Sequence, residues 1–292
     1  MLHEQAMLAA AAPLGQLPPW ELANLGVLAA GALVGVGWVA WLGRAGRWRN
    51  PLAGVVPPSG ESPPLASLIA VPLVVYVVAV AALLGTWGGE AGDAPQGPGS
   101  AAWHRPATLD GLAKRAAAGV MLWQWRRLRG PRRAGAGRLA LVAVGGALAV
   151  TAVTTVQHAL TQVVWARLGW EASQHPVLDA LHASEWGGWG QWQLVLAAVV
   201  VAPLVEELFF RGVLLEALWR ATGRAWPAVI VSGALFGVIH MGVPETVLPL
   251  CTFGWVLGYL RLRTGSVGMC VLLHALFNGR TMLMAWVAPE MM

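Results

Sequence analysis

Seven mostly apolar runs organise this chain, and segments rich in Arg, Pro and Gly separate them. Runs of this length and composition are typical of transmembrane helices. The predicted spans are Glu21–Leu42, Leu65–Trp87, Leu139–His158, Trp192–Phe210, Trp226–Met241, Glu245–Leu262 and Val267–Val287. The pattern therefore predicts an all-α polytopic membrane protein of about seven transmembrane helices.

The composition supports this class. The chain is 57% hydrophobic and only 11% charged, whereas a soluble domain carries about 25% charged residues. The net charge of +5 does not indicate nucleic-acid binding, because the Arg residues cluster between apolar runs as they do in membrane proteins. Cys251 and Cys270 lie within apolar runs and are expected to behave as small hydrophobic residues. The expected surroundings are thus a lipid bilayer, with no nucleic-acid partner.

Two regions are expected along the chain. Residues 1–138 contain two spans, a flexible linker and a basic segment, Leu109–Leu128, which we interpret as an interfacial amphipathic helix. Residues 139–292 form a second membrane domain, which carries the unusual polar residues described below.

Basic residues predict the orientation of the spans. With the N-terminus inside, three Arg-rich segments are cytoplasmic: Gly88–Arg138, Arg211–Arg224 and Arg261–Gly265. The Trp-rich segment Thr161–Gly190 is then outside. The cluster of Arg44, Arg47 and Arg49 disagrees with this topology, and a membrane crossing by Leu109–Leu128 would invert the first two spans.

Two adjacent carboxylates, Glu206 and Glu207, end an apolar run of a dozen residues. An ionisable group inside a bilayer costs several kcal/mol by rough estimate, so such a cluster suggests a functional site. Arg211 lies four residues after Glu207, and the two side chains share a helix face as an ion pair. Glu206 points about 100° away. Pro203 is expected to kink the helix just before the carboxylates.

Glu206 is expected to face His240. A turn near Thr222–Ala225 folds the chain back, with Glu206 16 residues before it and His240 15 residues after it. At about 1.5 Å per residue, both side chains reach a similar depth. Further along, His274 and Asn278 share a face of the last span. A structural ion pair with a core histidine remains the alternative.

Small residues suggest close helix contacts. The pair Gly31 and Gly35 lies in the first span. Gly233, Gly237, Gly254 and Gly258 indicate close approach of the fifth and sixth spans.

The polar residues also carry a resemblance. Glu206-Glu207-x-x-x-Arg211, Phe236-x-x-x-His240 and His274-x-x-x-Asn278, in this order on three apolar helices, resemble the CPBP family over about Trp186–Val287. That family includes the type II CAAX prenyl endopeptidases and the bacterial Abi-type proteins. The resemblance implies an intramembrane protease with an intramembrane polar active site. Its catalytic residues would be Glu206, Glu207, Arg211, His240, His274 and Asn278.

The same resemblance implies that Glu206 and His240 activate water, while His274 and Asn278 stabilise the oxyanion. The residue chemistry agrees, since peptide hydrolysis needs a base, a water and hydrogen-bond donors. Desolvation generally raises the pKa of a carboxyl group, which suits a base near neutral pH. Phe236 is either a wall of the site or an ordinary packing residue.

No cofactor is favoured from the sequence. Glu206, His240 and His274 form an alternative His₂Glu zinc set, which would make the protein a metalloprotease, but a metal-free glutamate mechanism is slightly preferred. The expected location is the bacterial cytoplasmic membrane. The expected substrate is a membrane-associated peptide or protein.

Two other functions stay open. Buried Glu, His and Arg residues also serve proton-coupled transporters, although no repeated halves are visible here. A non-catalytic membrane scaffold is the third possibility. Cleavage of a membrane-anchored peptide distinguishes the protease from both alternatives.

Overall fold

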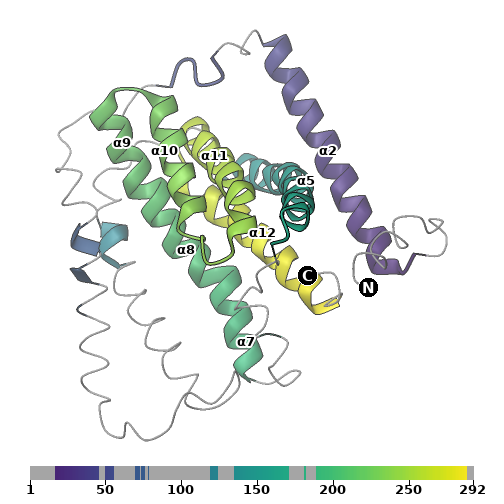
Figure 1. Ribbon diagram of the computed structural model, residues 1–292. Helices are drawn as coiled ribbons and strands as arrows, with labels where there is room; N and C mark the ends of the chain where they lie inside the picture. The colour runs from purple at the N-terminus through teal and green to yellow at the C-terminus, as the bar shows by residue number, and fades with distance from the viewer. Residues whose placement is uncertain are drawn as a thin grey trace, which may run out of the picture.

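The computed structural model describes residues 17–45, 50–55, 70–72, 74–75, 78, 119–123, 135–170, 181 and 189–287. Within these ranges the backbone forms helices and turns and no strand (Figure 1). The predicted all-α class is therefore confirmed, and the chain is a multi-pass membrane protein.

Long helices dominate the fold. The separate helices are α2 (Pro19–Arg44), α5 (Ala136–Arg167), α10 (Ala225–Val238), α11 (Val247–Thr264) and α12 (Val267–Val287). One further continuous run comprises α7 (Trp189–Leu196), the π-helical segment η2 (Ala197–Val201), α8 (Ala202–Glu207), the π-helical segment η3 (Leu208–Leu214) and α9 (Leu215–Thr222). A short 3₁₀ turn, η4 (Pro244–Thr246), precedes α11.

Four of these runs are long and apolar enough to cross a membrane: Pro19–Arg44, Ala136–Arg167, Gln191–Thr222 and Val267–Val287. They correspond to the first, third, fourth and seventh predicted spans. The fifth and sixth spans are the shorter helices α10 and α11. Most of the second span, Leu65–Trp87, lies outside the described residues. The linker lies outside them as well, as does most of Leu109–Leu128. The domain boundary at residue 138 therefore stays a prediction.

Two predicted boundaries were wrong. The loop expected from Thr161 begins later, because α5 continues to Arg167 and ends only before Gly169, whose φ is +72°. The loop expected at Arg261–Gly265 is mostly helix, since α11 ends at Thr264. In both cases the helix stops at a glycine in the left-handed region rather than where the charges begin.

The α10–α11 hairpin is held together by glycines, as predicted. A Cβ on Gly254 would lie 2.8 Å from Gly233 Cα, and one on Gly237 would lie 2.6 Å from the Val247 carbonyl oxygen. Gly258 is less constrained, because its added Cβ would only touch Val229 at 3.4 Å. The two helices thus approach until their backbones are in contact.

Helix α2 packs along α5 at one side of the bundle (Figure 1). A Cβ on Gly31 would lie 2.1 Å from the Leu148 carbonyl oxygen, so the crossing requires glycine there. A Cβ on Gly35 would lie 4.0 Å from Ala149 Cβ, so Gly35 has no such role. Asn24 of α2 also accepts a hydrogen bond from Arg280 of α12.

The run from α7 to α9 changes helical geometry twice, on either side of the two glutamates. Pro203 has no N–H, so it cannot continue a regular α-helical ladder. The chain responds with the π-turn η2 just before it, and η3 follows directly after Glu207. Such π-turns are rare and occur frequently at functional sites. The run then ends at Gly223, with φ of +64°, and the chain folds back into α10 as predicted.

The main core lies between α5, the η3 segment and the last three helices. Its fully buried aromatic and aliphatic members include Phe236, Phe253, Leu257 and Leu273. Cys251 and Cys270 are both buried free thiols, as expected of small hydrophobic residues. This core surrounds the polar cluster described next.

Candidate active site

Glu207 and Arg211 form the predicted ion pair. Arg211 Nη1 donates to Glu207 Oε1 at 2.9 Å, and neither side chain has any solvent exposure. Arg211 Nη2 also donates to the Gly254 carbonyl oxygen at 3.2 Å, and its guanidinium carbon lies 4.6 Å from the centre of the Phe236 ring. The charge of Arg211 is therefore balanced by a carboxylate, a carbonyl and an aromatic face.

Glu207 holds a second partner that the sequence did not reveal. His274 Nδ1 lies 2.9 Å from Glu207 Oε1. A carboxylate oxygen bonded in this way accepts, so the Nδ1–H of His274 donates, and Nε2 is left to face away from Glu207. Glu207 thus fixes both the position and the tautomer of His274.

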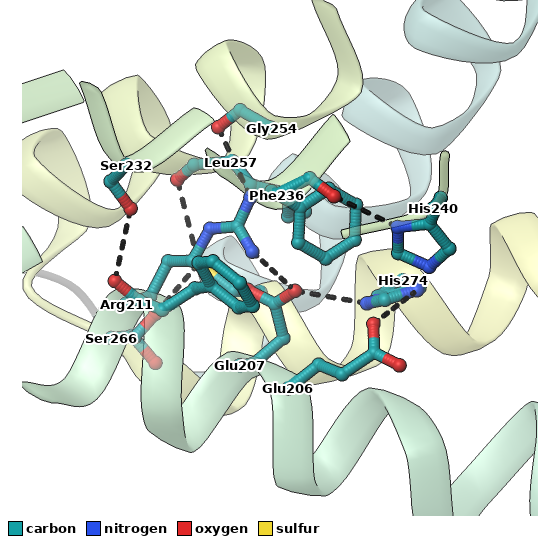
Figure 2. Close-up of polar contacts among 12 residues, drawn as sticks. Glu206, Glu207, Arg211, Ser232, Phe236, His240, Gly254, Leu257, Ser266 and His274 are labelled. Carbon is teal, nitrogen blue, oxygen red and sulfur yellow. Dashed lines mark hydrogen bonds and ion pairs between the residues drawn. The ribbon is translucent and has the colours of Figure 1, made fainter. Parts of the chain in front are cut away.

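Glu206 occupies a different environment from its neighbour. Its side chain is 26% exposed, against 0% for Glu207. Glu206 Oε2 lies 3.9 Å from His274 Nε2, which is too long for a direct hydrogen bond. The two adjacent carboxylates therefore lie on opposite sides of one imidazole ring, one tightly bonded and one not (Figure 2).

His240 was expected to face Glu206. In the part of the chain that the structure describes, the ion-pair contact of Glu206 is with His274, and His240 interacts with Glu206 electrostatically. His240 lies beyond the end of α10, and its Nδ1–H donates back to the Phe236 carbonyl oxygen at 2.8 Å. Its ring nevertheless lies at the same end of the cluster as His274 and Glu206 (Figure 2).

Phe236 is the aromatic platform of the cluster. It is 1% exposed, and its ring centre lies 5.1 Å from that of His240 and 5.6 Å from that of His274. Because the same ring also lies under Arg211, it fixes the spacing of three polar side chains. Phe236 is thus both a packing residue and a wall of the site.

Asn278 lies near η2. Its Nδ2 donates to the Ala198 carbonyl oxygen at 2.9 Å. The N–H of Ala202 bonds to Ala197 instead of Ala198, and Pro203 has no N–H to offer. Asn278 therefore satisfies a carbonyl that the proline-containing π-turn leaves without its usual helical donor. The role in oxyanion stabilisation stays a prediction.

A second buried ion pair was missed. Glu216 of α9 and Arg261 of α11 are 1% and 4% exposed and are in direct contact. Arg261 was interpreted as a cytoplasmic loop residue from the positive-inside pattern. The missed signal is that Glu216 continues the buried face of its helix, so it required a cation from another helix.

The zinc alternative concerns Glu206, His240 and His274. Among the described residues, no group of three or more His, Cys, Asp or Glu side chains is arranged to hold a metal ion. The Nδ1–H groups of His240 and His274 donate to the Phe236 carbonyl and to Glu207, and histidines that bind a metal through Nε2 commonly have the same kind of partner at Nδ1. The zinc alternative therefore stays a prediction, and no step below uses a metal.

Comparisons with known proteins agree with the resemblance read from the motifs. Residues 188–280 match the family model described as type II CAAX prenyl endopeptidase Rce1-like. Two proteins of Bacillus subtilis (strain 168) are similar over part of their length. "Uncharacterized protein YyaK" is 37% identical over 95 residues, covering 29% of this chain and 32% of that protein. "Putative membrane peptidase YdiL" is 25% identical over 85 residues, covering 29% of this chain and 34% of that protein.

The chain thus spans about a third of the length of these curated relatives. No solved structure matches. The matched segment contains all six residues of the cluster, from Glu206 to Asn278. The predicted resemblance is therefore confirmed for residues 188–280, which match the Rce1-like, type II CAAX prenyl endopeptidase family model.

Proposed function

We propose that this protein is an intramembrane endopeptidase that hydrolyses a peptide bond of a membrane-associated protein or peptide with water activated by Glu206. The family match and the relative named as a membrane peptidase support a membrane endopeptidase in general. The finer assignment rests on the cluster of residues described above.

The difference between the two glutamates carries the proposal. Glu207 is fully buried, and its Oε1 is bonded to both Arg211 and His274. Its other oxygen, Oε2, is buried without a hydrogen-bond partner, so Glu207 has no access to a substrate. Glu206 is partly exposed and makes no short contact with His274. A general base must have an unengaged lone pair and access to its substrate. Only Glu206 meets both conditions.

The nucleophilic water would bind beside the gap between Glu206 Oε2 and His274 Nε2. A polar separation of 3.9 Å suits two groups that share a water rather than bond directly. Glu206 takes a proton from this water as the oxygen attacks the carbonyl carbon. It then returns the proton to the nitrogen as the C–N bond breaks, so the step is balanced without another reactant.

His240 is the group that we propose to contact the developing oxyanion from the other side of the site. Its Nδ1–H is held by the Phe236 carbonyl, which leaves Nε2 facing the cluster. Nε2 is an acceptor in the neutral ring, so the proposed contact requires the imidazolium form, in which Nε2 also carries a proton and donates to the oxyanion. Losing one such donor costs roughly 2.7–4 kcal/mol of transition-state stabilisation in other hydrolases. The remaining N–H of Asn278 is a second candidate donor.

The substrate and the membrane remain part of the proposal. The apolar helices require a bilayer, and we propose the bacterial cytoplasmic membrane. A CAAX-protease-like activity on a membrane-anchored peptide is the form of the reaction that the family match favours.

Reconstitution into liposomes tests the proposal. Wild-type protein should cleave a membrane-anchored peptide library, with products identified by mass spectrometry. The matched control for Glu206→Gln is Glu21→Gln, since Glu21 lies in the first turn of α2, outside the cluster. Proton-driven solute flux with no cleavage would instead favour a transporter, and the absence of both would favour a scaffold.

A further inference from the structure

A cavity lies between α7 and α12, just beyond the polar cluster. Its volume is about 230 Å³, and its lining is almost entirely apolar. The lining residues that matter here are Trp192, Val195, Val199, Gly279, Met282 and Trp286. The catalytic proposal assigns no role to this cavity.

The cavity adjoins the polar cluster at two pairs of residues that are neighbours along the chain. Val199 follows Ala198, and Gly279 follows Asn278, and Ala198 and Asn278 are hydrogen bonded to each other. The bond between Asn278 and Ala198 therefore separates the cavity from the cluster. One wall of the cavity belongs to the helical run that also carries Glu206. The other wall belongs to α12, which carries His274.

The separation is short enough for one peptide to occupy both places. Val199 lies seven residues before Glu206, and Met282 lies eight residues after His274. At about 1.5 Å per residue, the cavity lies about 10–12 Å along the helices from the reacting groups. An extended peptide advances about 3.3 Å per residue, so this distance corresponds to about three residues.

The size of the cavity selects its occupant. At about 30 Å³ for each water-sized unit, 230 Å³ holds roughly eight such units. One large side chain has this size, and the distance of the cavity from the reacting groups matches a residue of a peptide bound at the site. We propose that the cavity is a specificity pocket for one bulky apolar side chain of the substrate, about three residues from the cleaved bond. This inference rests on the proposed peptidase function.

Gly279 keeps this pocket open. A Cβ there would lie 3.6 Å from Val199 Cγ1, an ordinary contact, so helix packing does not require glycine at this position. A larger side chain would instead extend into the cavity. Met282 lines the same space, and shortening it would enlarge the pocket. The two positions therefore allow opposite changes in pocket size.

The test measures kcat/KM in liposomes for peptides with Ala, Leu, Phe or Trp at each position from two to four residues from the cleaved bond. Leu or Phe at the third position should be preferred over Ala by on the order of 10–200-fold, as apolar pockets discriminate. Gly279→Leu should remove this preference, and Met282→Ala should shift it toward Trp.

Two matched controls lie on the same helix. Gly268→Leu introduces the same side chain where an added Cβ meets only Ser266 Oγ at 3.9 Å. Leu276→Ala shortens an exposed side chain outside the pocket. Both controls should keep the wild-type preference. Equal kcat/KM for all peptides, or an unchanged preference in Gly279→Leu, would overturn the pocket assignment while leaving the peptidase proposal intact.

A binding experiment covers the case in which no peptide is cleaved. Folded Glu206→Gln protein is irradiated with a peptide that carries a benzophenone side chain at the third position. Cross-links to α12 near Gly279 and Met282 are expected, and their absence would overturn the inference. If cleavage depends on the acyl-chain length of the vesicle lipid and not on the peptide residue, the pocket holds a lipid chain and the inference is wrong.

Discussion

Replacing Asn278 with Ala separates two roles for this residue. In the structure, its amide donates to the Ala198 carbonyl that the π-turn leaves without a helical donor. Asn278→Ala removes this donor within an apolar bundle. If the role is structural, the variant loses stability. If Asn278 acts only on the oxyanion, the variant loses activity and keeps its stability.

The structure gives the magnitude. A buried carbonyl left without its partner costs about 1–3 kcal/mol. The midpoint of thermal unfolding changes by about 2–4 °C for each kcal/mol in domains of 150–250 residues. Asn278→Ala should therefore melt several degrees below the wild type in detergent.

Pro203→Ala provides the decisive second change. It restores a backbone N–H five residues after Ala198, where a π-turn donor is needed. In this background, the loss caused by Asn278→Ala should be smaller, with a coupling energy of about 0.5–3 kcal/mol. The assay is thermal unfolding of the wild type, both single variants and the double variant, together with circular dichroism to confirm helicity.

Additive losses in the four proteins would refute the reasoning. So would an unchanged melting temperature in Asn278→Ala with cleavage abolished, because that result assigns the residue to chemistry alone. The cycle isolates the Asn278–Pro203 coupling only if both single variants keep the native helical content.

Three further predictions follow from the same contacts. Glu207→Ala should lower stability by roughly 3–5 kcal/mol because it leaves a buried cation uncompensated. Removing Arg211 as well should recover only part of this loss, since His274 also loses its acceptor. Full recovery on thermal unfolding would contradict the shared role of Glu207. Gly254→Ala should prevent normal pairing of α10 and α11, because its Cβ would lie 2.8 Å from the Gly233 backbone. Gly268→Ala is the control. Wild-type expression and melting temperature of Gly254→Ala would contradict the close packing of the two helices. Exhaustive chelation should change neither melting temperature nor cleavage, whereas activity that is lost and then restored by zinc would contradict the metal-free proposal.

The sequence was sufficient for the features that depend on spacing along one helix. The Glu207–Arg211 pair follows from a four-residue separation, and the turn at Gly223 follows from the break between two apolar runs. The close contact of α10 and α11 follows from Gly233 and Gly254. Helical periodicity and small residues determine these features locally.

Contacts between helices could not be predicted from the sequence where they depend on small rotations of one helix about its axis. The π-turns beside Pro203 change the direction of Glu206 and Glu207 relative to α12, so a regular helix could not predict which of them bonds His274. His240 lies in the turn after α10, where helical spacing does not determine its contacts.

Charge alone misplaced one further residue. Arg261 was assigned to a loop, but it is buried against Glu216 on another helix. The positive-inside pattern counts charges near the ends of spans and cannot distinguish a cytoplasmic Arg from one that is paired inside the bundle.

The central claim is that Glu206 is the base and Glu207 is structural. The most direct test compares Glu206→Gln with Glu207→Gln in the same liposome cleavage assay, with thermal unfolding measured on the same preparations. Glu206→Gln should stay folded and lose cleavage by at least about 10²–10⁴-fold, while Glu207→Gln should lose stability. Cleavage by Glu206→Gln, together with a folded but inactive Glu207→Gln, would reverse the two roles and contradict the account.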